Sequence, residues 1–260
     1  MDFTIKKYRH LLHALKDAGY GFQPFAGFIE RPEEKVIVLR HDVDARKLNS
    51  LLFARLQAKE GIRGTYYFRI VPKSFDENVI REIAALGHEI GYHYETMDTC
   101  RGDIDKAYNE FCRNLDMFRK IVPVKTICMH GSPLSKYDNR SLWKKYDYKT
   151  LGITGEPYFD IDFGKVLYLT DTGRRWDGQK VSVRDKVQGD DYRNQKSTQH
   201  LLLPSLHSTN DIIAAASAGK LPDQIMFTFH PQRWTDKPLP WVSELLWQNM
   251  KNFIKRMIIK

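Results

Sequence analysis

The stretch Lys35–Asp44, which reads KVIVLRHDVD, decides the fold. Its first half is a compact β-branched run of the kind found in strands that are buried on both faces of a parallel sheet. Its second half carries two carboxylates, Asp42 and Asp44. Residues i and i+2 of a strand point to the same side, so we expect the two carboxylates to converge on one centre. Close carboxylates repel, and a divalent cation resolves that conflict by binding one and leaving the other as a base.

Strand-like runs alternate with helix-like spacing on both sides of this stretch. Further strands are predicted at 65–70, 89–92, 125–129, 166–170 and 224–229. Helical spacing is found over 4–18, 46–60, 76–86, 104–118, 198–218 and 241–258. Such alternation implies a largely parallel sheet. With this many units, a closed or nearly closed barrel competes with an open doubly wound sheet.

Chemically capable residues follow the buried runs. His93, His130, Asp171 and His230 each come directly after one of the predicted strands, as Asp42 does. In a parallel barrel these positions share one rim, where such enzymes place their sites. An open sheet would bring together only the residues near a switch point. The pattern therefore favours a barrel, formed by a single domain over 1–260.

The imidazoles are the predicted metal ligands. His93, which follows a predicted strand, is a strong candidate for a metal ligand because neutral imidazole is the usual nitrogen ligand of zinc. Glu95, two residues on, either reaches the same metal or holds an imidazole in place. The turn at His130, Gly131, Ser132 and Pro133 is equally consistent with a site residue and with a histidine that only caps the turn.

Two aromatic residues lie in the expected loops. Trp176 follows Asp171 in the segment DTGRRW and would be costly to leave exposed without a ligand to cover it. Trp234 follows His230 in HPQRW. The alternative for any lone histidine is a hydrogen-bonded packing residue, and no chemistry is assigned to the histidines of the predicted helices: His10, His13, His200 and His207.

Composition limits the partners. The 41 basic and 32 acidic residues give a net charge of +9, but the charges are scattered and no nucleic-acid motif accompanies them, so we expect no nucleic-acid partner. The C-terminal helix carries the densest basic patch, which leaves a weak peripheral contact with anionic carriers or phospholipid open. No apolar stretch approaches the roughly 20 residues of a membrane span, and no secretory signal is visible. Three cysteines without a CxxC pair indicate reduced thiols and a cytoplasmic location.

These residues resemble the polysaccharide deacetylases of the NodB-homology group, carbohydrate esterase family 4, from about Val36 to Trp234. The resemblance is strongest to the subgroup with an HDVD first motif found in O-antigen and other surface-glycan clusters. It implies an α/β fold, an irregular (distorted) (β/α) barrel of about seven parallel strands. In the first motif it makes Asp42 the base and Asp44 a metal ligand. The segment Gly87–His93 matches the second motif, which makes His93 a ligand.

The later motifs imply further roles. Asp171 and Trp176 resemble the aspartate and tryptophan of the fourth motif, and His230 before Pro231 resembles the histidine acid of the last motif. Asp171 is then expected to orient His230. The expected substrate contacts are Trp176, Trp234, Arg174 and Glu95.

Two departures from the family pattern affect the metal site. The second histidine of the second motif falls at Met97, and methionine is a poor zinc ligand. The third motif, which usually offers an arginine and prolines, reads His130, Gly131, Ser132 and Pro133 here. Either His130 or Glu95 completes the metal site, or the site is degenerate. We expect His130 to be the third ligand.

The resemblance implies a metal-dependent hydrolase that removes an N-acetyl group from an acetylated amino sugar in surface-polysaccharide (O-antigen or lipopolysaccharide) biosynthesis. One divalent metal ion is expected, with zinc favoured. The alternatives are another metal-dependent hydrolysis of a C–N bond on the same scaffold, such as cyclic-amide hydrolysis, and a non-catalytic glycan-binding protein with a degenerate metal site. The sequence does not indicate the oligomeric state.

Overall fold

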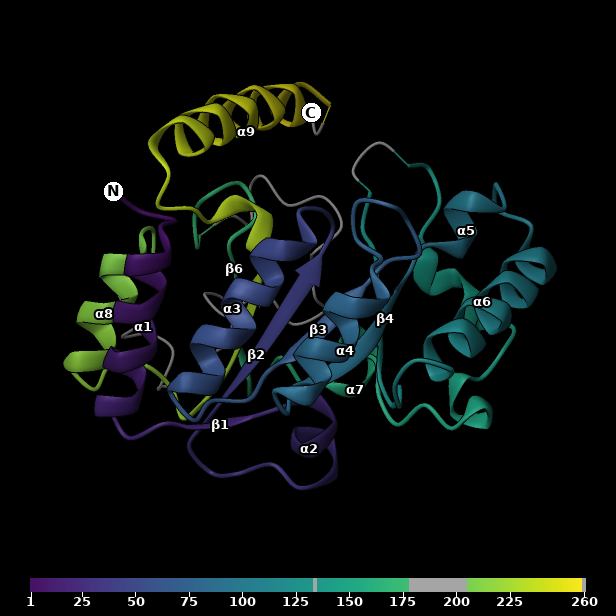
Figure 1. Cartoon of the computed structure of the whole chain (residues 1–260), viewed down its shortest axis with the longest axis horizontal. Helices are drawn as coiled ribbons and strands as arrows, with labels where there is room; N and C mark the ends of the chain where they lie inside the picture. The colour runs from purple at the N-terminus through teal and green to yellow at the C-terminus, as the bar shows by residue number, and fades with distance from the viewer. Residues whose placement is uncertain (133–134, 178–204, 259–260) are drawn as a thin grey trace.

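Seven parallel strands form one curled sheet with β2 near its centre (Figure 1). The structure, a computed structural model, describes residues 1–132, 135–177 and 205–258, the side chains of 253–258 excepted. The strands are β1 (Gly21–Gln23), β2 (Val36–Val43), β3 (Thr65–Phe68), β4 (Glu89–Tyr94), β5 (Ile127–Met129), β6 (Leu167–Thr170) and β7 (Gln224–Phe229). Their order is β5-β4-β3-β2-β7-β6, and β1 pairs with the first part of β2. This curled half-barrel confirms the distorted (β/α) barrel that the sequence predicted.

Helices surround the sheet. They are α1 (Ile5–Asp17), α2 (Phe25–Glu30), α3 (Lys47–Lys59), α4 (Glu77–Ala85), α5 (Thr96–Thr99), α6 (Ile104–Arg119), α7 (Pro157–Asp160), α8 (Thr209–Ser217) and α9 (Pro238–Ile258), with 3-10 turns η1 (Asn139–Lys144), η2 (Tyr148–Leu151) and η5 (Pro231–Arg233). Among the described helices, none is long and apolar enough to cross a membrane. The prediction of a single domain stays a prediction.

The long helices match the predicted ones within a few residues, because their apolar periodicity is strong. Asp76 caps α4 by accepting from the backbone N–H groups of Asn78 and Val79. Of the helix predicted over 198–218, residues 198–204 lie outside the described residues and 205–208 are not helical, because Ser208 caps α8 and the helix begins at Thr209. Short elements such as β1, α2 and α7 were not predicted, because three to six residues hold too little periodicity.

Alternation along β2 separates two apolar clusters. Ile37 and Leu39 point into the large cluster between the sheet and the helices. Val36 and Val38 point into a smaller cluster inside the half-barrel. Because side chains alternate along a strand, Arg40 and Asp42 continue the inner row. The two polar side chains are therefore placed inside the barrel by the same register that buries the valines.

His41 belongs to the outer row and is a core residue. Its ring stacks on Tyr66 at a centroid distance of 4.1 Å, and its Nδ1 lies 3.0 Å from the carbonyl oxygen of Thr65. Burial lowers the pKa of His41 to about 3, so the ring is neutral. The histidine of the HDVD segment is thus a packing residue.

Two strands are longer than the sequence indicated. β2 continues through Val43 because Arg40–Val43 pair with Thr65–Phe68 of β3, and β4 continues through Tyr94 because Tyr92–Tyr94 pair with β5. His93 therefore lies within β4 and not after it. Pairing with a neighbouring strand holds these polar residues in an extended conformation. Local composition does not show this pairing.

Gly91 of β4 is expected to be intolerant of substitution. It pairs with Tyr67 of β3, and the Tyr67 ring occupies the place that a Cβ would take, with the carbonyl oxygen of Thr126 at 3.0 Å. Gly91→Ala should cost about 1–3 kcal/mol through overpacking and lower the melting temperature by several degrees. Gly27→Ala is the control, because nothing lies within 4 Å of its added Cβ. Equal melting temperatures for the two variants would contradict this packing.

Candidate metal centre and active site

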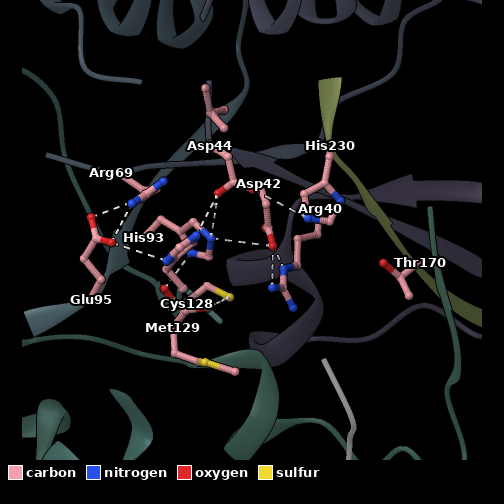
Figure 2. Close-up of polar contacts among 12 residues, drawn as sticks. Arg40, Asp42, Asp44, Arg69, His93, Glu95, Cys128, Met129, Thr170 and His230 are labelled. Atoms are coloured by element: carbon pink, nitrogen blue, oxygen red, sulfur yellow. Dashed lines mark hydrogen bonds and ion pairs between the residues drawn. The ribbon is translucent and has the colours of Figure 1, made fainter. Parts of the chain in front are cut away.

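The carboxyl ends of five strands bring the predicted site residues together. Asp44 follows β2, His93 lies near the end of β4, His130 follows β5, Asp171 follows β6 and His230 follows β7. Figure 2 shows Asp42 and Asp44 between His93 on one side and His230 on the other. The residues at these strand ends thus share one rim, as the sequence pattern predicted. Some of them are far apart in the chain: Gln232 contacts Asp44 across 188 positions.

Asp44 lies at the centre of this group. Its Oδ1 is 3.4 Å from Nε2 of His130 and 3.7 Å from Nε2 of His93. This oxygen is buried and receives no hydrogen bond from the described residues. Ligands held roughly 2.0–2.2 Å from a tetrahedral zinc ion lie about 3.4 Å from each other. Each of the two spacings fits a pair of ligands on one divalent cation, but the ligand nitrogens of His93 and His130 lie more than 4.8 Å apart, so the three groups would have to move closer to share one ion.

His93 is oriented for ligation by the neighbouring strand. Its Nδ1–H donates to the carbonyl oxygen of Cys128 at 2.9 Å, which leaves the lone pair of Nε2 directed at the carboxylates. Burial lowers the pKa of His93 to about 4, even though Asp42 acts in the opposite direction. His93 is therefore neutral near pH 7, as a metal ligand must be.

His130 is held by a carboxylate on its other side. Its Nδ1 lies 3.3 Å from Oε2 of Glu95, and Glu95 accepts two hydrogen bonds from Arg69, at 3.1 Å and 2.5 Å. Burial opposes charge on both groups, yet the pKa of His130 is raised by Asp44 and Glu95, and that of Glu95 is lowered to about 2 by His130 and Arg69. Glu95 thus lies beside the imidazole of His130, and the choice between its two roles stays a prediction.

A second possible ligand set shares His93. Ligand atoms of Asp42, His93 and Cys128 all lie within 4.8 Å of one another, the one such trio of His, Cys, Asp or Glu among the described residues. In the group of Asp44, His93 and His130, each imidazole lies near the carboxylate, but the two imidazoles lie farther from each other. A cation bound by Asp42, His93 and Cys128 would compete with a side chain that already forms an ion pair with Asp42.

That partner is Arg40. Its Nε and Nη2 donate to the two oxygens of Asp42 at 2.8 Å and 2.7 Å, and both side chains are almost fully buried. Burial alone would raise the pKa of Asp42, but Arg40 and His93 hold it well below its usual range. A carboxylate already neutralised by a guanidinium attracts a cation less, so the geometry favours Asp44 over Asp42 as the ligand.

Asp171 and His230 form a buried pair. Nδ1–H of His230 donates to Oδ1 of Asp171 at 2.6 Å, and Nε2 faces Oδ2 of Asp44 at 3.9 Å. Trp234 and Arg233 also donate to Asp171, at 2.7 Å and 2.9 Å. Burial opposes the charge, but His230 and Arg233 lower the pKa of Asp171. The carboxylate thus fixes the tautomer that turns Nε2 toward the centre.

The structure buries two of the expected substrate contacts. Trp176 and Trp234 are 3% and 0% exposed, packed against Phe229 within the main core. The guanidinium of Arg174 lies over the rings of Phe3 and Trp241, at 5.0 Å and 4.7 Å. The two tryptophans are therefore core residues, whereas Arg174 is half-buried and its role as a substrate contact stays a prediction. The sequence indicated a substrate contact because a tryptophan in a loop at a strand end is costly to leave exposed, but distant segments cover both rings.

The sequence did not single out three further residues of the site: Arg40, Arg69 and Gln232. Nε2 of Gln232 donates to Oδ2 of Asp44 at 3.3 Å. A signal existed for Arg40, since a cation inside a run as apolar as KVIVL needs a buried anion. Met97, at the place of the missing histidine, is 6% exposed and part of the main apolar cluster.

Comparison with known proteins gives distant structural likenesses. No protein-family model and no curated protein matches the chain. A pseudoenzyme of carbohydrate esterase family 4 from Bacillus anthracis is 12% identical with a TM-score of 0.45, over 86% of this chain and 63% of that one. The chain thus spans less than two thirds of that protein.

Two further solved structures are similar to a comparable extent. A polysaccharide deacetylase from Bacillus cereus is 12% identical with a TM-score of 0.43, over 84% of this chain and 89% of that one. A family 4 carbohydrate esterase from Bacillus anthracis is 11% identical with a TM-score of 0.43, over 98% of this chain and 90% of that one.

Proposed function

We propose that this chain is a metal-dependent hydrolase that removes the acetyl group from an N-acetylated amino sugar. The observation that carries the proposal is the buried oxygen of Asp44, which lies 3.4 Å and 3.7 Å from two imidazole nitrogens. The donor atoms suit zinc, with Asp44, His93 and His130 as its ligands. Such a cation would supply Lewis acidity toward an acyl carbonyl and its attacking water.

Two groups of the chain flank this centre and divide the proton transfers. Asp42, kept ionised by Arg40, accepts a proton from the attacking water as the new C–O bond forms. His230 donates a proton to the amide nitrogen as the C–N bond breaks, with Asp171 holding its ring. The products are acetate and the free amine. The low pKa of Asp42 makes it a weak base, so its role depends on position more than on basicity.

The finer part of the proposal comes from the HDVD-type motifs. Their resemblance to deacetylases of surface-glycan clusters supports an O-antigen or lipopolysaccharide sugar as the substrate class, carried on a nucleotide, a lipid or a glycan. The three cysteines without a CxxC pair support a cytoplasmic site of action.

Release of acetate tests the proposed reaction. Purified protein loaded with zinc is expected to release acetate from N-acetylated hexosamines, free and nucleotide-linked, and to lose this activity with a chelator and in Asp44→Asn. Hydrolysis of cyclic amides without acetate release would replace the proposed reaction with the alternative one. Sugar binding that is unchanged by chelation, with no turnover, would indicate a binding protein.

The pairing of Glu95 with His130 gives a separate prediction. Glu95→Gln should weaken zinc binding about 10–100-fold above pH 7, because the amide holds the ring less firmly. Glu95 helps to raise the pKa of His130, and zinc must displace that proton, so affinity falls as pH falls through this pKa. In Glu95→Gln that fall should shift to lower pH. Titration calorimetry at several pH values measures both effects.

The matched control is Glu82→Gln, which removes a carboxylate from an exposed pair with Arg55. It should leave zinc affinity and its pH dependence unchanged. If Glu95→Gln behaved like this control, His130 would not be a ligand held by Glu95.

A further inference from the structure

The C-terminal helix α9 contacts the rest of the protein through its polar side. Gln248 is 2% exposed, and Nδ2 of Asn252 donates to the carbonyl oxygen of Gly173 at 3.0 Å. Glu244 is largely buried and lies 3.9 Å from Arg46, and the indole N–H of Trp241 donates to the carbonyl oxygen of Asp2 at 2.7 Å. These four residues are spaced three and four apart, so they share one face of the helix.

The opposite face is apolar and exposed. Its large side chains are Leu239 (84% exposed), Val242 (46%), Leu246 (65%), Trp247 (50%) and Met250 (45%). They make up half of the ten large apolar side chains of the described residues that are exposed, within a segment of 12 residues. An amphipathic helix normally turns this side toward the core. In α9 the apolar side faces away from the core, so we expect another surface to bind it.

We propose that α9 docks on an anionic lipid surface through the face formed by Leu239, Val242, Leu246, Trp247 and Met250. Charge decides between lipid and a second copy of the chain. The chain carries +9, and α9 itself has one acidic residue, Glu244, against Lys251, Lys255 and Arg256. Like charges oppose self-association, whereas leucine and tryptophan beside lysine and arginine are typical of helices that lie in an anionic membrane interface.

The position of α9 would bring the rim of the half-barrel to the same surface. Its inward contacts are with Arg46, which follows β2, and Gly173, which follows β6. Figure 1 shows α9 across the end of the molecule toward which β2 points. Docking would therefore orient the carboxyl ends of the strands toward lipid, whatever reaction the site performs.

Vesicle binding by the full chain tests the proposal. Flotation with phosphatidylcholine vesicles, with and without phosphatidylglycerol, should show binding only to the anionic ones, weakened by high salt. Trp247 fluorescence should shift to the blue on binding, and the shift should be lost in Trp247→Phe. Leu246→Glu should reduce partitioning at least about tenfold.

Leu48→Glu is the matched control, since Leu48 on α3 is 67% exposed and the change in charge is the same. It should bind vesicles like the unmodified protein. Equal losses in the two variants, or no binding to anionic vesicles, would overturn the proposal. So would a dimer in sedimentation without lipid that Leu246→Glu dissociates, because that result would make a second copy the cover.

Discussion

Replacing His130 with alanine is expected to abolish stoichiometric zinc binding, while replacing Cys128 with serine leaves it intact. Both residues lie beside His93, but Nε2 of His130 is 3.4 Å from the orphaned oxygen of Asp44. Cys128 would need Asp42 as its fellow ligand, and Arg40 already neutralises that carboxylate. Loss of one of three protein ligands leaves too few donors to retain the ion. Acetate release should fall to background in His130→Ala.

The metal content of both variants, measured by elemental analysis after zinc loading, checks this prediction. His93→Ala, common to both possible ligand sets, should also lose the metal and serves as the positive control. Cobalt substitution adds a spectroscopic readout, because a thiolate ligand gives charge-transfer absorption that nitrogen and oxygen ligands do not. Zinc retained in His130→Ala and lost in Cys128→Ser would move the metal to Asp42, His93 and Cys128.

Changing Asp42 to asparagine is expected to lower deacetylation about 10²–10⁴-fold with the metal retained, because the amide cannot accept the proton of the attacking water. The change also leaves the guanidinium of Arg40 buried beside a neutral partner. Breaking a buried pair in this way costs about 3–5 kcal/mol, so the variant should melt at a lower temperature. Metal content and rate must therefore be measured well below the new melting temperature.

Arg40→Gln separates the role of Asp42 in catalysis from its role in stability. This variant keeps the carboxylate and removes the group that holds its pKa low. The pKa of Asp42 should then rise toward its ordinary value, which moves the acidic limb of the pH–rate profile to higher pH while substantial turnover remains. If Asp42→Asn lost the metal, Asp42 would be a ligand. Full turnover in Asp42→Asn would exclude it as the base.

Much of the fold could be predicted from the sequence, because β-branched runs and helical periodicity are local properties. The run before Asp42 predicted the central strand, and the polar residues after the later runs predicted a shared rim. Two features could not be predicted. The lengths of β2 and β4 depend on pairing with β3 and β5, and short elements such as α2 carry too little periodicity.

The candidate site was predicted in its residue types but not in its pairings. Asp44, His93, His130, Asp171 and His230 do lie together, since parallel strands end on one side. Which atoms face each other depends on contacts between residues far apart in the chain. The pairs Glu95–Arg69 and Asp42–Arg40 were not expected, and the two tryptophans were expected to contact the substrate.

By itself, the sequence determined the alternation of strands and helices and the type of chemistry at the strand ends, because both depend on neighbours within a few residues. Only the tertiary structure decided which carboxylate is paired with an arginine and which has a buried oxygen without a hydrogen-bond partner among the described residues. Burial decided it: a charge removed from water must find a partner, and Arg40 lies beside Asp42 while Asp44 faces the imidazoles. The same packing of distant segments buried Trp176 and Trp234 and turned the apolar side of α9 outward.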